Sequence, residues 1–149
     1  MTRMKSAIIV FLFLAISITV AVSIDYTDTY VADRFHKALR TEQFEVGSPI
    51  SLDRFIEYYD WDEVHVIAPG ATLPDLKTQF GLPFNHTRDD DGVWSLIFVK
   101  SYYVVAEIHI QDSVLGYPLD VPTNHFDRWA AIIEILDDGE GKRMAFVGE

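Results

Sequence analysis

One stretch of the chain, residues 93–111, constrains the fold more than any other segment. It contains two runs of strand-forming residues, Val93–Val99 and Tyr103–Ile110, separated by the polar pair Lys100-Ser101. β-branched and aromatic residues dominate both runs. In the second run every other residue is apolar, and the residues between them include polar ones, so one face of the strand is expected to be buried. The spacing therefore predicts a central hairpin of two antiparallel strands.

The rest of the chain predicts helices first and strands last. Apolar spacing indicates a helix over Asp28–Phe44, one or two helical turns after Ser51, a strand around Val64–Ile67, a short helix over 72–80, and a strand pair at Ala130–Leu136 and Lys142–Val147. The run 126–136 is also compatible with a helix, but its isoleucines favour a strand. Because strands and helices do not alternate, we expect an α+β domain with a mostly antiparallel sheet and helices on one face.

An uncharged segment precedes this domain. Residues 7–24 form an apolar run of 18 residues, preceded by Arg3 and Lys5 and followed by Asp25 and Asp28. A helix of this length rises about 27 Å, close to the roughly 30 Å of a bilayer core. We therefore expect residues 1–24 to be a transmembrane signal anchor or a signal peptide, with the basic end in the cytoplasm.

The two interpretations of this segment predict different locations for the mature protein. Ala21-Val22-Ser23 has small residues at alternate positions, as signal peptidase requires, so cleavage after Ser23 would give a secreted protein. Retention would anchor it in a bacterial cell membrane. In either case residues 25–149 form one extracytoplasmic domain, and a membrane contact is expected only through the N-terminal helix.

Composition excludes several classes of function. The chain has 23 acidic and 12 basic residues and a net charge of −11, so it lacks the basic surface of a nucleic-acid-binding protein. It has no cysteine, which removes thiolate metal sites and cysteine nucleophiles. It also lacks the glycine-rich loops that hold phosphates, and no cofactor is predicted.

The segment Trp61-Asp62-Glu63-Val64-His65-Val66-Ile67-Ala68-Pro69 carries a resemblance. It is similar to the Trp-Asp-x-Val-x-Val-x-x-Pro strand of a group of small bacterial membrane-anchored or exported proteins, and the likeness spans residues 50–110. Those proteins often continue with Pro-Tyr where this chain has Pro69-Gly70. The resemblance implies a similar fold and a bacterial origin, and it implies no activity or catalytic residue.

Histidines and carboxylates give one candidate for chemistry. No two of the five histidines have the spacing of a local metal motif. However, His65 and His109 fall on predicted strands and can share a sheet face, with Glu63 and Glu107 each two residues away and so on the same face. The alternatives are a solvated face, which the residue types favour, and a small metal-dependent hydrolase with a His/carboxylate site.

Aromatic residues give a second candidate. Tyrosine provides contact area at low entropic cost, so Tyr58, Tyr59, Tyr102 and Tyr103 are candidate binding residues. Without Arg3 and Lys5 the net charge of −11 becomes −13, and such a field favours a basic protein partner. The primary expectation is therefore a non-catalytic binding domain rather than an enzyme.

Overall fold

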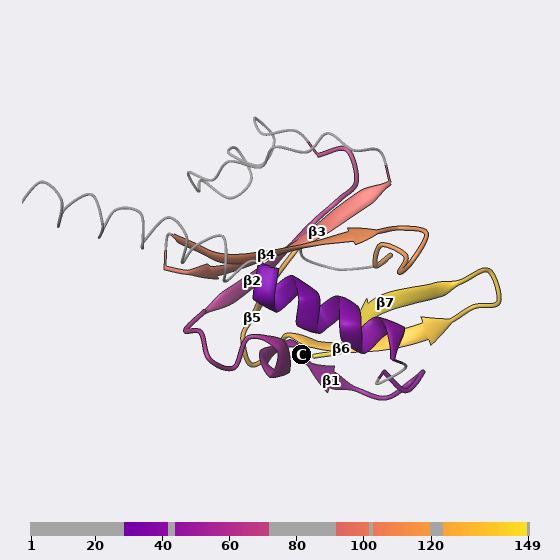
Figure 1. Cartoon of the computed structure of the whole chain (residues 1–149), viewed down its shortest axis with the longest axis horizontal. Helices are drawn as coiled ribbons and strands as arrows, with labels where there is room; N and C mark the ends of the chain where they lie inside the picture. The colour runs from indigo at the N-terminus through magenta and orange to yellow at the C-terminus, as the bar shows by residue number, and fades with distance from the viewer. Residues whose placement is uncertain (1–28, 42–43, 72–91, 102, 120–123, 149) are drawn as a thin grey trace, which may run out of the picture.

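Two antiparallel sheets form the body of the protein (Figure 1). The computed structural model describes residues 29–41, 44–71, 92–101, 103–119 and 124–148. One sheet has the strand order β1-β6-β7, with β1 at Ile50–Ser51, β6 at Ile132–Asp137 and β7 at Lys142–Phe146. The other has the order β4-β3-β2-β5, with β2 at Glu63–Ile67, β3 at Val93–Lys100, β4 at Tyr103–Gln111 and β5 at His125–Asp127. All pairings between these strands are antiparallel.

The predicted central hairpin is confirmed as β3 and β4. Its register pairs Trp94 with Ile110 and Leu96 with Ile108, and a β-bulge interrupts it between Phe98 and Val99. Along β4, Ile108 and Ile110 are fully buried while the residues between them are only partly so. The alternation in the sequence therefore identifies the face of the hairpin that packs into the core.

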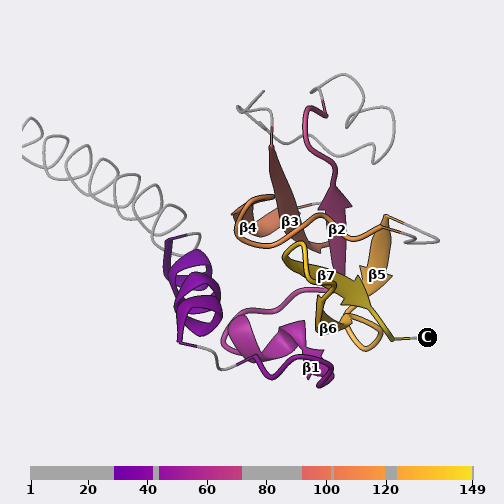
Figure 2. The same cartoon turned by 90° about the vertical axis from the view of Figure 1, so that its right-hand side faces the viewer.

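Residues 29–40 form the predicted helix, which lies beside both sheets (Figure 2). Val31, Phe35 and Ala38 are buried at the helical spacing that the sequence shows. The helical turn predicted after Ser51 is confirmed as the 3₁₀ helix η1 at Leu52–Phe55, and the Ser51 side chain accepts a hydrogen bond from the Asp53 N–H. This is the N-cap that satisfies a donor without a helical partner.

The main core lies where the inner faces of both sheets meet the helix. It contains Phe35 from the helix, Trp94 and Phe98 from β3, Ile108 from β4 and Ile133 from β6. The outer face of the four-stranded sheet carries a second, smaller apolar cluster, formed by Ile67, Ile97 and Val99. Both faces of this sheet therefore bury apolar side chains, and β3 is buried along nearly its whole length.

The fold-class prediction is wrong in its architecture. The strand pair at the C-terminus is confirmed as the β6–β7 hairpin, but it pairs with β1 instead of joining the β2–β3–β4 sheet. Neither β1 nor the three-residue β5 is predicted, and the chain changes sheets between β5 and β6. One long helix is present among the described residues, so helices do not cover one sheet face.

Two predicted helices fall outside the described residues. They are the transmembrane or signal helix at residues 1–24 and the short helix over 72–80. Across the positions that are described, no helix is long and apolar enough to cross a membrane.

Candidate binding surface

Three large aromatic side chains are exposed near one end of the four-stranded sheet. Tyr58 is 75% exposed, Tyr103 is 76% exposed and Trp129 is 71% exposed. Tyr58 follows η1, Tyr103 begins β4, and Trp129 lies in the turn between β5 and β6. Single exposed apolar residues are common on protein surfaces, but several large ones gathered on one surface mark an interaction site. We call these three residues the aromatic surface.

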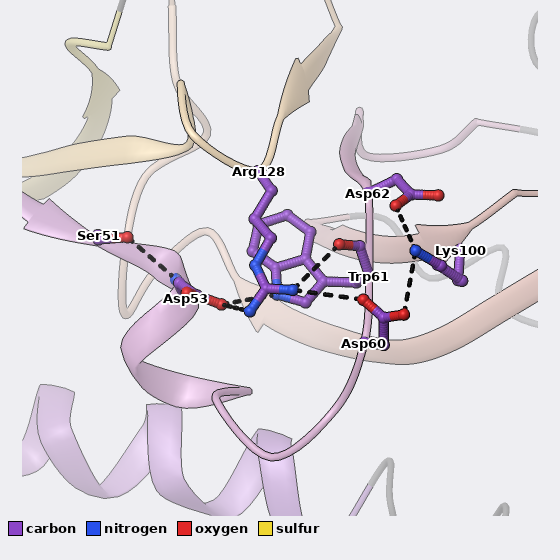
Figure 3. A network of polar contacts seen from close by, with 7 residues as sticks. All are labelled: Ser51, Asp53, Asp60, Trp61, Asp62, Lys100 and Arg128. Carbon is purple, nitrogen blue, oxygen red and sulfur yellow. Dashed lines mark hydrogen bonds and ion pairs between the residues drawn. The ribbon is translucent and has the colours of Figure 1, made fainter.

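A polar network joins the segments that carry these aromatic residues (Figure 3). Arg128 places its guanidinium 2.8 Å from the Asp53 carboxylate and 3.5 Å from the Asp60 carboxylate. The same guanidinium lies 5.5 Å from the ring centroid of Trp61, within the range of a cation–π contact. The Trp61 Nε1–H donates a 3.0 Å hydrogen bond to Asp53 Oδ1. Arg128 therefore connects the β5–β6 turn to both η1 and the Asp60 loop.

Lys100 connects the β3–β4 turn to the same loop. Its Nζ lies 3.1 Å from Asp60 Oδ2 and 2.7 Å from Asp62 Oδ1. The other Asp62 oxygen accepts a 3.0 Å hydrogen bond from the backbone N–H of Ser101. Ser101 has a φ of 55°, a left-handed conformation that residues other than glycine seldom adopt. Asp62 thus holds the turn that leads into Tyr103.

The electrostatics of this contact agree with its geometry. The hydrogen bond from Lys100, and then the Ser101 N–H, lower the pKa of Asp62 below its ordinary value. Conversely, the hydrogen bonds to Asp62 and Asp60 raise the pKa of Lys100. Both groups are therefore charged at neutral pH, and the network keeps its ion pairs there.

Each exposed aromatic residue lies close in the chain or sheet to a member of the network. Tyr58 precedes Asp60 by two residues, Trp129 follows Arg128, and Tyr103 is the cross-strand partner of Lys100. A surface whose loops are already fixed loses less conformational entropy on binding than a mobile one. The arrangement is therefore suited to recognition by rigid aromatic contacts.

The predicted tyrosine set is only partly assembled at this surface. Tyr58 and Tyr103 are exposed there, whereas Tyr59 is half-buried and packs against the main core. Tyr102 lies outside the described residues. Trp129 was not among the predicted binding residues, because it directly precedes the strand predicted at Ala130–Leu136, where an aromatic side chain is more often part of the packing. The signal that could identify it is Asp127-Arg128, a charged pair that interrupts the run.

The His/carboxylate candidates do share one face of the sheet, as predicted. His65 pairs with Ile97 on β3, Ile97 pairs with Glu107 on β4, and His109 pairs with Ser95 two residues along. His65 Nε2 lies 3.2 Å from the Glu63 carboxylate, and His109 Nδ1 lies 3.7 Å from the Glu107 carboxylate. His65 is 7% exposed, whereas the side chains of Glu63 and His109 are 44% and 33% exposed, so the face is solvated only in part.

These residues form two separate pairs rather than one metal-binding cluster. Within the described segments, no group of three or more histidine, cysteine, aspartate or glutamate residues is placed to hold a metal ion. Ser95, His109 and Glu107 also do not form a hydrolytic triad. Ser95 Oγ lies 2.9 Å from His109 Nδ1, the same nitrogen that faces Glu107. In a triad the serine and the acid contact different ring nitrogens.

The buried position of His65 predicts a dependence of stability on pH. Desolvation lowers the pKa of His65, the Glu63 carboxylate opposes this effect, and His125, whose ring stacks on it at 5.6 Å, adds to it. The unfolded chain then binds a proton more readily than the folded one. The contribution of His65 to stability is therefore complete above about pH 6.5 and is lost as the pH falls below that value.

Urea unfolding at pH 8 and pH 5 checks this prediction. The wild-type protein should lose more free energy of unfolding between the two pH values than His65→Gln does. The free energy of unfolding changes with pH in both proteins, and the two rates of change should differ by at most about 1.4 kcal/mol per pH unit, the limit for one proton. If the free energy of unfolding changes equally with pH in the two proteins, His65 is not responsible for the pH dependence of stability.

Comparisons with protein-family models, with curated proteins and with solved structures give no match for this chain.

Proposed function

We propose that this domain is a non-catalytic protein-binding module and that the aromatic surface is its contact site. The observation that carries the proposal is the exposure of Tyr58, Tyr103 and Trp129 around a network that fixes their loops. Tryptophan and tyrosine are the residues that most often dominate the binding energy of protein interfaces. A role in folding does not explain three such side chains in contact with water.

The charge of the chain supports a basic partner. The net charge is −11, and Asp60, in the middle of the network, keeps a side-chain exposure of 73%. An acidic field accelerates encounter with a positive surface, while aromatic contacts provide affinity at short range. The proposal includes an extracytoplasmic location for residues 25–149, which depends on the sequence of residues 1–24 alone.

Photo-crosslinking in intact cells tests the proposal. A photoreactive phenylalanine analogue is placed at position 129, at position 103 and, as a control, at Val46, which is 53% exposed on the other sheet. We expect positions 129 and 103 to capture the same partner, one rich in lysine and arginine, and Val46 not to capture it. Trp129→Ala should reduce capture from position 103 by about tenfold or more, because a hot-spot truncation has an effect of this size.

The salt dependence of association and the specificity of capture give the results that would contradict the proposal. Association measured with the captured partner should slow as the salt concentration rises, because ions screen charges beyond about 8 Å at physiological ionic strength. Capture from all three positions alike would indicate nonspecific contact. Unchanged capture with Trp129→Ala would remove Trp129 from the surface, and turnover of a substrate by the purified protein would contradict the non-catalytic assignment.

A further inference from the structure

A groove at the other end of β4 has a charge opposite to that of the protein as a whole. It encloses about 760 Å³ between the helix, the end of β4 and the start of β7. Its described lining includes Arg40, Lys142, His36 and His109, with Asp33 as its one acidic residue. The chain carries 23 acidic and 12 basic residues, so this concentration of basic groups is not what composition alone would give.

Half of the described arginine and lysine residues form no ion pair, and the two permanent cations of the groove belong to this half, together with Lys37 and Arg54. Arg34, Lys100, Arg128 and Arg143 each form an ion pair with a carboxylate. Within the part of the chain that the structure describes, Arg40 and Lys142 form no ion pair. An anionic group bound between Arg40 and Lys142 would accept charge-assisted hydrogen bonds from side chains that pair with no described carboxylate.

The remaining walls of the groove are suited to an apolar group. Leu39 and Val93 contribute aliphatic surface, and Val114 is 52% exposed within the groove. The volume falls within the range of about 300–1,000 Å³ that is typical of sites for small molecules, which combine apolar walls with a few polar groups. The basic residues and the apolar walls of the groove together suit a ligand that has one anionic head group and an apolar body.

We propose that this groove binds a small amphipathic anion, with a carboxylate or phosphate head at Arg40 and Lys142 and an apolar body against Leu39, Val93 and Val114. The site is separate from the aromatic surface. Tyr103 and His109 lie six residues apart on β4, which corresponds to about 20 Å along an extended strand. The two proposals can therefore fail independently.

Calorimetric titration of the full chain with matched probes tests the proposal. The probes are 2-naphthoate, 2-naphthyl phosphate, the neutral 2-naphthalenemethanol and the cationic 2-naphthylmethylammonium. We expect at least one of the two anions to bind about tenfold or more tightly than the alcohol, because hydrogen bonds to charged groups contribute most to such affinity. The anion that binds identifies the head group.

Matched variants locate the binding. The double variant Arg40→Gln/Lys142→Gln should weaken binding of that anion by about tenfold or more. The control Lys37→Gln/Arg54→Gln removes the same charge from exposed positions outside the groove and should not weaken it. Val114→Trp should block the groove, whereas Val46→Trp, an equally exposed apolar position on the other sheet, should not.

Three results would overturn the proposal. They are equal binding of the alcohol and both anions, an equal loss in the charge-matched control, and no binding of any probe to the wild-type protein. Thermal unfolding of each variant shows that a loss of binding is not a loss of folding. None of these results depends on the partner of the aromatic surface.

Discussion

Ile108→Asp is expected to unfold the domain. Ile108 is fully buried at the centre of β4, and its cross-strand partner Leu96 is also fully buried. An aspartate there places a carboxylate among apolar side chains, and its burial costs about 4 kcal/mol or more without a compensating partner. Loss of the buried isoleucine side chain costs about 2–5 kcal/mol more. The sum equals or exceeds the stability of a domain in the lower half of the roughly 5–15 kcal/mol range, so most of the folded population of such a domain should be lost.

Gln111→Asp is the matched control for this experiment. It introduces the same charge into the same strand, at an exposed position. Its effect should stay within about 0.5 kcal/mol. Circular dichroism and thermal unfolding measure both variants, and equal shifts would show that the assigned face of β4 is wrong. Glu107 is less suitable as a control, because its side chain is only 16% exposed and contacts His109.

Trp61→Ala should have the second largest effect. The Trp61 ring is 1% exposed, packs edge-to-face on Phe98 at 5.1 Å and donates its Nε1–H to Asp53. Truncation of a buried tryptophan leaves a cavity and costs about 3–5 kcal/mol. For a domain of this size we expect the melting temperature to fall by about 10–15 °C.

Trp129→Ala makes the same chemical change at a position that is 71% exposed. It should leave the melting temperature nearly unchanged while it removes one of the three aromatic groups of the proposed interface. A large loss of stability in Trp129→Ala would mean that Trp129 packs against the domain and is not available for binding. If Trp61→Ala and Trp129→Ala lowered the melting temperature by similar amounts, the assignment of Trp61 as buried and Trp129 as exposed would be contradicted.

The motif that carried the resemblance has a structural explanation within this chain. Trp61 supports the guanidinium of Arg128, and Asp62 holds Lys100 and the strained turn at Ser101. Val64 and Val66 point into the main core from β2. These residues join strands that are distant in sequence, so the pattern indicates a structural element and does not by itself indicate an activity.

For the candidate sites, the sequence predicts which side chains share a face wherever one strand or one hairpin decides this. The alternation of residues along β4 and the two-residue spacing from Glu63 to His65 place side chains on a face without knowledge of any partner strand. Their burial was not predictable in the same way. His65 is buried because the strands on both sides and the second apolar cluster cover its surroundings. Whether a histidine on a sheet face meets water depends on what packs over that face.

Local sequence patterns are enough to predict several elements of this protein: the helix at residues 29–40, the turn capped by Ser51, and the two hairpins. These elements follow from periodicity and from contacts between residues close in the chain. Tertiary structure alone decided that the β6–β7 hairpin pairs with β1 in a sheet of its own, and that Trp129 lies exposed beside Arg128. It also decided which basic residues meet at the groove. The reason is that hydrophobic burial specifies which face of a strand turns inward, but does not specify its neighbour when several strands present equally apolar faces.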